Sequence, residues 1–184
     1  CFIGIILTLC ANAASEIDPL KNINERTHVL NQTLDLQLAS PIARFYKRVT
    51  PDFIEISITN FTSNIEDLSI AINNILQGKP TDGISDITRF TINSTLGIGG
   101  FIDVASGLGL DKNDEDFGQT LAVWGIPDGP YLVLPGLGPS TMRDTLAMIP
   151  DAFLTPLWLI DHDRTAYSLT AIDLVDTRAR YLGL

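Results

Sequence analysis

The sequence has little of several things that enzymes and secreted domains use. In 184 residues it contains two cysteines, Cys1 and Cys10, and two histidines, His28 and His162. Both cysteines lie in the first ten residues, so the rest of the chain forms no disulfide and has no thiol chemistry. Two histidines far apart in the sequence do not supply the three or four ligands of a zinc site. We therefore expect no metal and no cofactor.

Charge is also scarce, and positive charge most of all. Charged residues make up 18% of the chain, and the formal net charge is −10, from 12 lysines and arginines against 22 aspartates and glutamates. Binding of nucleic acid needs a basic face, so a nucleic-acid partner is excluded. A purely electrostatic attraction to anionic lipid headgroups is disfavoured for the same reason.

The stretch from Arg89 to Asp144 combines two features that seldom occur together. It holds ten of the fourteen glycines and four of the ten prolines, yet Asp103 and Asp128 are the only charges within long apolar tracts. Loops normally face water to satisfy their peptide groups, and no tract here offers the roughly 18–20 uninterrupted apolar residues of a spanning helix. The pattern predicts a protein that lies in a membrane or encloses an apolar cavity. We expect Asp103 to face a polar lumen and Asp128 to stabilise its loop as an Asx turn.

The first thirteen residues are expected to be a signal peptide that lacks its own beginning. They are apolar and end in Ala11-Asn12-Ala13, a small-residue cleavage site. Two fates remain open. Cleavage after Ala13 would leave no cysteine, whereas Cys10 could instead be lipidated, although Leu9 departs from the small residue that normally precedes a lipidated cysteine. Residues 14–184 are expected to form a single helical domain whose C-terminus is truncated.

Helix start and stop signals recur along this domain and predict an all-α fold. Pro41 is expected to end the first helix and to open a short second one. Later helices are expected at about residues 51–77, 82–96, 101–106, 117–124, 141–148 and 164–182. Ser140 is expected to cap the helix that follows it.

The clearest helix, 51–77, is amphipathic. Its apolar residues recur at alternating steps of four and three; they are Ile54, Ile58, Phe61, Ile65, Leu68, Ile72 and Ile75. We expect this stripe on the buried or lipid-facing side, with Asn60 pointing toward a lumen or a neighbouring helix. On a membrane protein, such a helix separates lipid from an aqueous lumen.

The loop Gly125–Pro130 can only be tight, given its glycines and prolines. Gly125 and Gly129 permit backbone angles that other residues avoid. The apolar segments 121–124 and 131–134 flank the loop as the arms of a hairpin would. It is either a mobile element that controls passage into the protein or a rigid turn, and the sequence leaves both open.

Signs of catalysis or ion binding are weak. The segment around Ser140 lacks the last glycine of a nucleophile elbow. Asp161-His162-Asp163 are consecutive and do not converge on one metal ion, and the acidic run 111–116 lacks the spacing of a calcium loop, which favours a solvated turn. The basic cluster of Arg44, Lys47 and Arg48 is either a headgroup contact or a solvated helix face, and we favour the solvated face. We expect no enzyme.

Three segments together resemble one family. They are NFTSNI from Asn60, RFTINSTLGIGGFIDVA from Arg89, and DFGQTLAVWGIPDGPYLVLPGLGPSTMRD from Asp116. Their motifs are long, and they are similar to those of the MlaA/VacJ family of outer-membrane lipid-transport proteins. The resemblance implies a ring of amphipathic and interfacial helices around a central channel, in the outer membrane on its periplasmic side, without a full spanning helix.

The resemblance also implies a function and partners. Members remove misplaced phospholipids from the outer leaflet and pass them to a soluble periplasmic lipid carrier, and this removal maintains lipid asymmetry. They also associate with trimeric porins. Two alternatives from other classes are a periplasmic phospholipid hydrolase and a structural porin-associated lipoprotein. The residues expected along the lipid path are Asn60, Phe61, Asp103, Gly125 and Gly129.

Overall fold

The computed structural model describes residues 19–155 and 163–182, and these residues form helices and one short hairpin. The helices are α2 (Lys21–Leu34), η1 (Asp35–Ala39), α3 (Ser40–Val49), α4 (Asp52–Leu76), α5 (Pro80–Thr95), α6 (Val104–Gly107), α7 (Phe117–Val123), α8 (Met142–Leu154) and α9 (Asp163–Arg180). The strands are β1 (Tyr131–Leu134) and β2 (Gly138–Thr141). The predicted signal peptide with Cys10, and also Asp161 and His162, lie outside the described residues.

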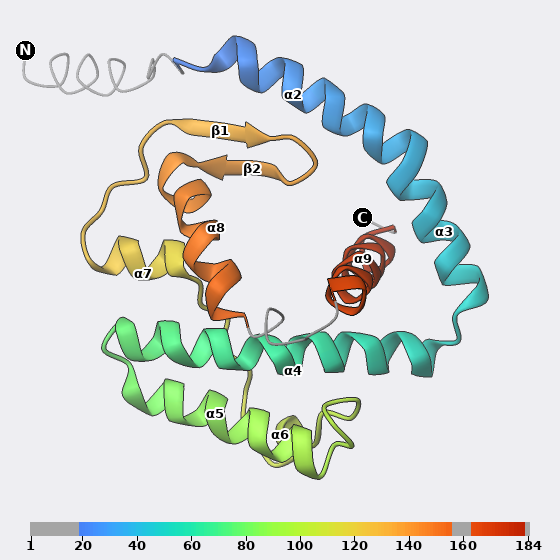
Figure 1. Cartoon of the computed structure of the whole chain (residues 1–184), viewed down its shortest axis with the longest axis vertical. Helices are drawn as coiled ribbons and strands as arrows, with labels where there is room; N and C mark the ends of the chain where they lie inside the picture. The colour runs from blue at the N-terminus through green and yellow to red at the C-terminus, as the bar shows by residue number, and fades with distance from the viewer. Residues whose placement is uncertain (1–18, 156–162, 183–184) are drawn as a thin grey trace, which may run out of the picture.

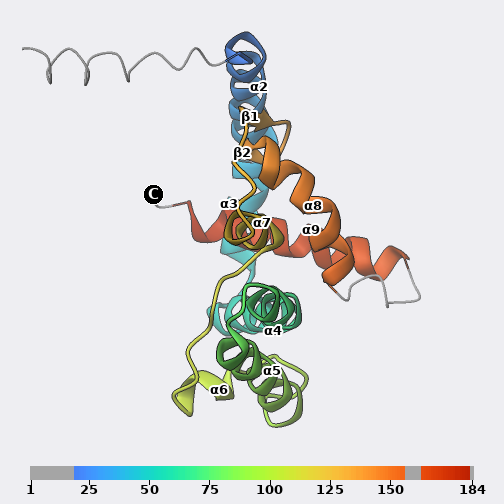
Figure 2. The ribbon, with the colours of Figure 1, turned by 90° about the vertical axis from the view of Figure 1, so that its left-hand side faces the viewer.

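The elements are arranged as a ring (Figure 1). The continuous helix α2–η1–α3 forms one side, α4 forms the next, and α7, α8 and the hairpin complete the circuit back to α2. Helix α9 lies inside the ring against α3 and α4, and its axis crosses the ring plane, as the two views together show (Figure 2). Helix α5 packs on the outer side of α4, and α6 packs against α5. The predicted ring of helices is confirmed.

Two asparagines of α2 close the ring, because their side chains form hydrogen bonds with the backbone of β1 and of the turn that follows it. The side chain of Asn24 donates to the carbonyl of Tyr131 at 3.0 Å and accepts from the amide of Val133 at 2.9 Å. Asn31 donates to the carbonyl of Leu134 at 2.8 Å and accepts from the amide of Gly136 at 2.8 Å. The seam therefore depends on side-chain amides rather than on apolar packing alone.

The burial pattern is the reverse of that of a water-soluble protein. The largest fully buried side chains are polar; they are Asn73, Asn74, Thr120, Asp67, Asp86 and Asp176. Large apolar side chains face outward instead, among them Phe45 at 66% and Phe53 at 69% exposed. An exposed apolar surface of this extent marks contact with a membrane or partner. Among the described helices none is long and apolar enough to cross a membrane.

Pro41 opens the short helix α3 as predicted, but it does not end the first helix, so that part of the prediction is wrong. The chain passes from α2 into α3 through the π-helical turn η1, and Pro41 sits in the first turn of α3. Proline removes a hydrogen-bond donor and clashes with the preceding turn of a regular α-helix. The wider π turn directly before it accommodates both effects without breaking the helix.

The hairpin also differs from the prediction. Segment 121–124 is not its first arm but belongs largely to α7, and β1 pairs antiparallel with β2, with Tyr131 opposite Thr141. The loop Gly125–Pro130 joins α7 to β1. Thr141, not Ser140, caps α8, because its side chain accepts from the amide of Asp144.

Candidate functional site

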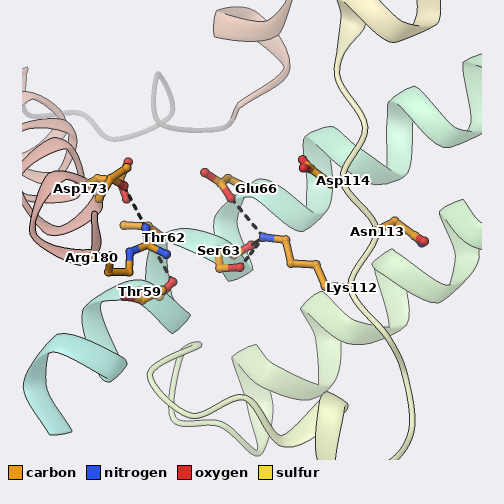
Figure 3. A pocket seen from close by; sticks show the side chains of 10 residues that line it. Thr59, Thr62, Ser63, Glu66, Lys112, Asn113, Asp114, Asp173 and Arg180 are labelled. Carbon is orange, nitrogen blue, oxygen red and sulfur yellow. Dashed lines mark hydrogen bonds and ion pairs between the residues drawn. The ribbon is translucent and has the colours of Figure 1, made fainter. Parts of the chain in front are cut away.

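A pocket of about 410 Å³ opens between α4, α9 and the connection from α6 to α7 (Figure 3). We call it the polar pocket. The described residues that line it all have polar or charged side chains; they are Thr59, Thr62, Ser63, Glu66, Lys112, Asn113, Asp114, Asp173, Thr177 and Arg180. A cavity with this lining is suited to a hydrated, charged group rather than to an acyl chain.

Regular helix spacing brings these residues to one place. Residues 59, 62, 63 and 66 of α4 lie three and four positions apart, which places them on one helix face. Residues 173, 177 and 180 of α9 follow the same spacing on the opposing wall, and residues 112–114 form the third wall (Figure 3). Asp176, which is fully buried, joins α9 to its neighbours by accepting from Tyr46 at 3.0 Å and Thr59 at 2.7 Å.

Lys112 is the cation held closest to α4. Its ammonium group donates to the hydroxyl and carbonyl oxygens of Ser63 and lies 3.1 Å from Glu66. It also lies 3.9 Å from Asp67, which is buried beneath the pocket. On α9, Arg180 pairs with Asp176 at 3.4 Å and donates to Thr177 at 2.9 Å. Two cations therefore stand on different walls of the polar pocket.

A second, smaller cavity adjoins the polar pocket. It measures about 130 Å³ and lies between α4 and α9; its lining consists of Phe61, Thr62, Ile65, Glu66, Thr155, Leu169, Thr170 and Asp173. We call it the apolar pocket, because Phe61, Ile65 and Leu169 supply its hydrophobic wall. Thr62, Glu66 and Asp173 line both cavities. Charged and apolar surfaces therefore meet at one place.

A buried ionic network underlies this region. Arg89, which is 3% exposed, lies 3.6 Å from Asp67 and 3.3 Å from Asp103. Burial raises the pKa of Asp67 to about 6, against the positive charges of Lys112 and Arg89, which lower it. The carboxylate oxygens of Asp67 accept no hydrogen bond from the described residues. Burial thus destabilises the ionised form of the Asp67 carboxyl group.

Asp103 behaves in the opposite way. Burial acts to raise its pKa, but hydrogen bonds from Ser106 and Asn93 and the charge of Arg89 outweigh burial and hold the pKa at about 2. Its carboxylate caps α6 by accepting from the amide of Ser106 at 3.1 Å. Asp103 therefore stabilises a helix start and a buried arginine, which also explains how a charge is tolerated in an apolar tract.

Buried amides fix the connection that carries Lys112. Asp86 accepts from Asn74 at 2.8 Å and from Asn113 at 2.9 Å. Burial raises the pKa of Asp86, while these hydrogen bonds lower it. Since Asn74 is on α4 and Asp86 on α5, the third wall of the pocket is tied to both helices. The segment 111–116 is mostly exposed, as the sequence favours, but Asn113 ties it to the helices.

The residues expected along a lipid path fall into two groups. Asn60 and Asp103 line one narrow polar cleft, and Asn60 donates to the carbonyl of Phe101 at 3.2 Å. Phe61 stacks on Phe101 with ring centroids 5.0 Å apart and lines the apolar pocket. These three residues lie close together, and their role in lipid passage stays a prediction.

Gly125 and Gly129 lie elsewhere, in the loop after α7. Both have positive φ, +86° and +70°, as their expected backbone freedom requires. The indole of neighbouring Trp124 donates to Leu76 at the end of α4, fifteen residues or roughly 22 Å along the helix from Phe61. The carboxylate of Asp128 pairs with Arg143 of α8 rather than closing an Asx turn, and the carbonyl of Asp128 accepts from the amide of Arg143 at 3.0 Å.

Other residues considered from the sequence take structural places. Ser140 lies in β2 opposite Leu132, and its hydroxyl forms hydrogen bonds with Thr141 and Thr145. Lys47 pairs with Glu55 at 2.6 Å, and the basic cluster does not contribute to the lining of the polar pocket. Among the described residues no group of three or more potential ligand side chains could hold a metal ion.

Sequence reasoning missed most of the pocket. Its charged residues come from three segments that are tens of residues apart in the sequence; they include Glu66, Lys112, Asp173 and Arg180. No local sequence pattern predicts that these segments meet. A weak signal was present on α9, where polar residues recur at positions 173, 177 and 180, three and four residues apart.

Comparison with known proteins shows which family has this architecture. The sequence model of the MlaA lipoprotein family matches residues 16–184. The chain belongs to the MlaA lipoprotein family. An Escherichia coli relative, the intermembrane phospholipid transport system lipoprotein MlaA, is 33% identical over 96% of this chain and 73% of its own length. A Rickettsia conorii relative is 37% identical over 88% of this chain and 64% of its own length, so the chain spans less than two thirds of that protein.

A solved structure agrees with the MlaA assignment. It is described as the structural basis for maintenance of bacterial outer membrane lipid asymmetry, and it superposes with a TM-score of 0.80 at 32% identity. The match covers 90% of this chain and 85% of the other. The ring of helices is therefore the MlaA fold.

Proposed function

We propose that this chain is an outer-membrane phospholipid transport protein. It removes misplaced phospholipids from the outer leaflet and passes them to a soluble periplasmic lipid carrier, in association with a trimeric porin. The observation that carries the proposal is the inverted burial, with apolar side chains outside and a polar pocket beside an apolar one between α4 and α9. The names of the relatives and of the solved structure support the same assignment.

Transport of this kind needs no catalyst, because a lipid that moves between membranes makes and breaks no covalent bond. The protein must shield the headgroup from lipid and the acyl chains from water. A polar cavity next to an apolar one meets both needs at once. The surroundings of Ser140 supply no general base among the described residues, so hydrolysis is not favoured.

The test is to measure phospholipid at the cell surface with a membrane-impermeant probe in a strain lacking the gene. We expect surface phospholipid to rise, and the full-length chain to restore the ordinary level. Thr177→Trp fills the polar pocket and is expected to fail in this restoration. Thr81→Trp, on the exposed start of α5, is the matched control and is expected to succeed.

An unchanged outer leaflet in the deletion strain would contradict transport and leave a structural role. Release of fatty acid from phospholipid vesicles by the purified protein, abolished by Ser140→Ala, would identify a hydrolase instead. Failure of Thr177→Trp is informative only when the variant reaches the membrane in ordinary amount, so its abundance there is measured alongside.

A further inference from the structure

The polar pocket carries an unusual balance of charge for a site that receives a phosphate. Its lining contains two cations, Lys112 and Arg180, and three carboxylates, Glu66, Asp114 and Asp173. Each cation already pairs with a carboxylate of its own. Lys112 pairs with Glu66, and Arg180 pairs with Asp176. An anion alone would meet more negative than positive charge here, which disfavours its binding.

A ligand with both a phosphate and a positive charge matches this lining. The phosphate of a phospholipid can accept hydrogen bonds from the cations and the threonine hydroxyls. An ammonium group at the other end can then meet the carboxylates of Asp114 and Asp173. These stand on facing walls of the pocket, on the α6–α7 connection and on α9 (Figure 3).

The lining also discriminates between kinds of ammonium group. Quaternary ammonium groups are recognised by cages of aromatic side chains. Among the residues that the structure describes, no aromatic side chain lines the polar pocket, whereas carboxylates, hydroxyls and the amide of Asn113 do. These groups accept hydrogen bonds, which a primary ammonium can donate and a quaternary one cannot.

The adjoining apolar pocket indicates how the ligand is oriented and that it is a lipid rather than a free phosphate. Because Thr62, Glu66 and Asp173 line both cavities, a headgroup in the polar pocket has its glycerol end beside Phe61, Ile65 and Leu169. A free phosphate or a free headgroup would leave that apolar wall uncovered. The two cavities together therefore favour an intact lipid.

We infer that the polar pocket selects phospholipids with a zwitterionic, primary-ammonium headgroup of the phosphoethanolamine type over anionic phosphoglycerol and quaternary phosphocholine lipids. This inference rests on the proposed transport function and deepens it. The headgroup phosphate lies between Lys112 and Arg180, and the ammonium group contacts Asp114 and Asp173.

The experiment is native mass spectrometry of the full-length, delipidated protein in non-ionic detergent. Phosphoethanolamine, phosphocholine and phosphoglycerol lipids with identical acyl chains are titrated in competition. We expect phosphoethanolamine to bind about tenfold more tightly than phosphoglycerol, the ratio that one charge-assisted hydrogen bond supplies. Asp173→Asn and Asp114→Asn should each reduce this ratio without weakening phosphoglycerol binding.

Asp82→Asn is the control, since it removes the same charge from an exposed site on α5 outside the pocket. It should leave the ratio unchanged. Equal binding of the three headgroups, or an unchanged ratio in both pocket variants, overturns the selectivity while leaving transport intact. Binding of no lipid at all contradicts the proposed function itself. Displacement of bound lipid by inorganic phosphate alone would reveal a simple phosphate site and also overturn the inference.

Discussion

At the scale of single residues, the interior of this protein is rich in polar and charged side chains and poor in large apolar ones. Asp67 and Asp103 both contact Arg89, yet their pKa values move in opposite directions. The difference follows from hydrogen bonds. Asp103 accepts several, whereas the oxygens of Asp67 accept none from the described residues. The two carboxylates therefore respond to pH with opposite signs.

The first prediction concerns Asp67. Its pKa is about 6 in the fold against an ordinary value of 3.8, so its protonated form stabilises the fold; this stability is complete below pH 3.8 and is lost as pH rises through 6. Between pH 4 and pH 7 the loss is at most about 3 kcal/mol. Asp67→Asn should remove this part of the pH dependence in unfolding measurements in non-ionic detergent. An unchanged slope over that window would show that Asp67 titrates normally.

Asp103 predicts the reverse. Its pKa of about 2 lies below the ordinary 3.8, so its ionised form stabilises the fold above pH 3.8 and this stability is lost as pH falls through 2. Asp103→Asn should unfold more easily than the parent protein at pH 7 and approach it at pH 2. Thermal unfolding at the two pH values measures this, with Asp82→Asn as a variant of equal charge change on the surface. A deficit of the same size at both pH values would contradict the prediction.

At the scale of elements, the seam between α2 and the hairpin is the clearest point of weakness. Asn24 is 5% exposed and satisfies one carbonyl and one amide of β1. Asn24→Ala leaves the buried amide of Val133 and the carbonyl of Tyr131 without that partner, at a cost of about 1–3 kcal/mol. We expect faster hydrogen exchange at the amide of Val133, with protection within α4 and α5 unchanged.

Asn31→Ala serves as the comparison for this seam, because its side chain accepts from the amide of Gly136 instead. Each variant should expose its own amide more than the other. If both variants speed exchange throughout the molecule equally, the seam is not a separate unit but part of one cooperative fold.

The sequence predicted elements better than it predicted their surroundings. The expected helix 51–77 matches α4 almost to the residue, because a stripe of isoleucines between proline and glycine signals is strong local evidence. Periodicity does not say which face of a helix is buried. In α4 the polar residues Asn64, Asp67 and Asn74 are buried. Pro41 and the hairpin failed for a related reason. A π turn and a strand containing Pro139 both depart from the regular patterns on which sequence rules are built.

At the scale of the whole molecule, the outward apolar surface predicts how the protein meets a membrane. Large apolar side chains are exposed on α3, α4 and α5, including Phe45, Phe53 and Ile84. We expect the protein to remain with membranes at high salt, because apolar burial is little screened by ions. Fractionation in buffers of rising salt measures this, and release of the chain by salt alone would contradict it.

Single charges placed on that surface give a sharper version of the same prediction. Phe45→Asp and Phe53→Asp should weaken membrane association, since a carboxylate in the apolar region costs about 2–3 kcal/mol. Thr81→Asp, at an exposed polar site of α5, should not. The measurement is partition of the purified variants between vesicles and buffer. Equal partition of all three variants would show that these phenylalanines face a protein partner or water.

The ring closure has a consequence for the order in which the molecule assembles. The contacts between α2 and the hairpin join residues 103 to 109 positions apart, whereas β1 and β2 are neighbours in sequence. The hairpin can therefore form within itself, while its docking must await most of the polypeptide and overcome the entropy of closing a long loop. During synthesis α2 emerges more than a hundred residues before its partner. A nascent chain that stops before β1 is an open arc, and only the arrival of the hairpin makes it a circle.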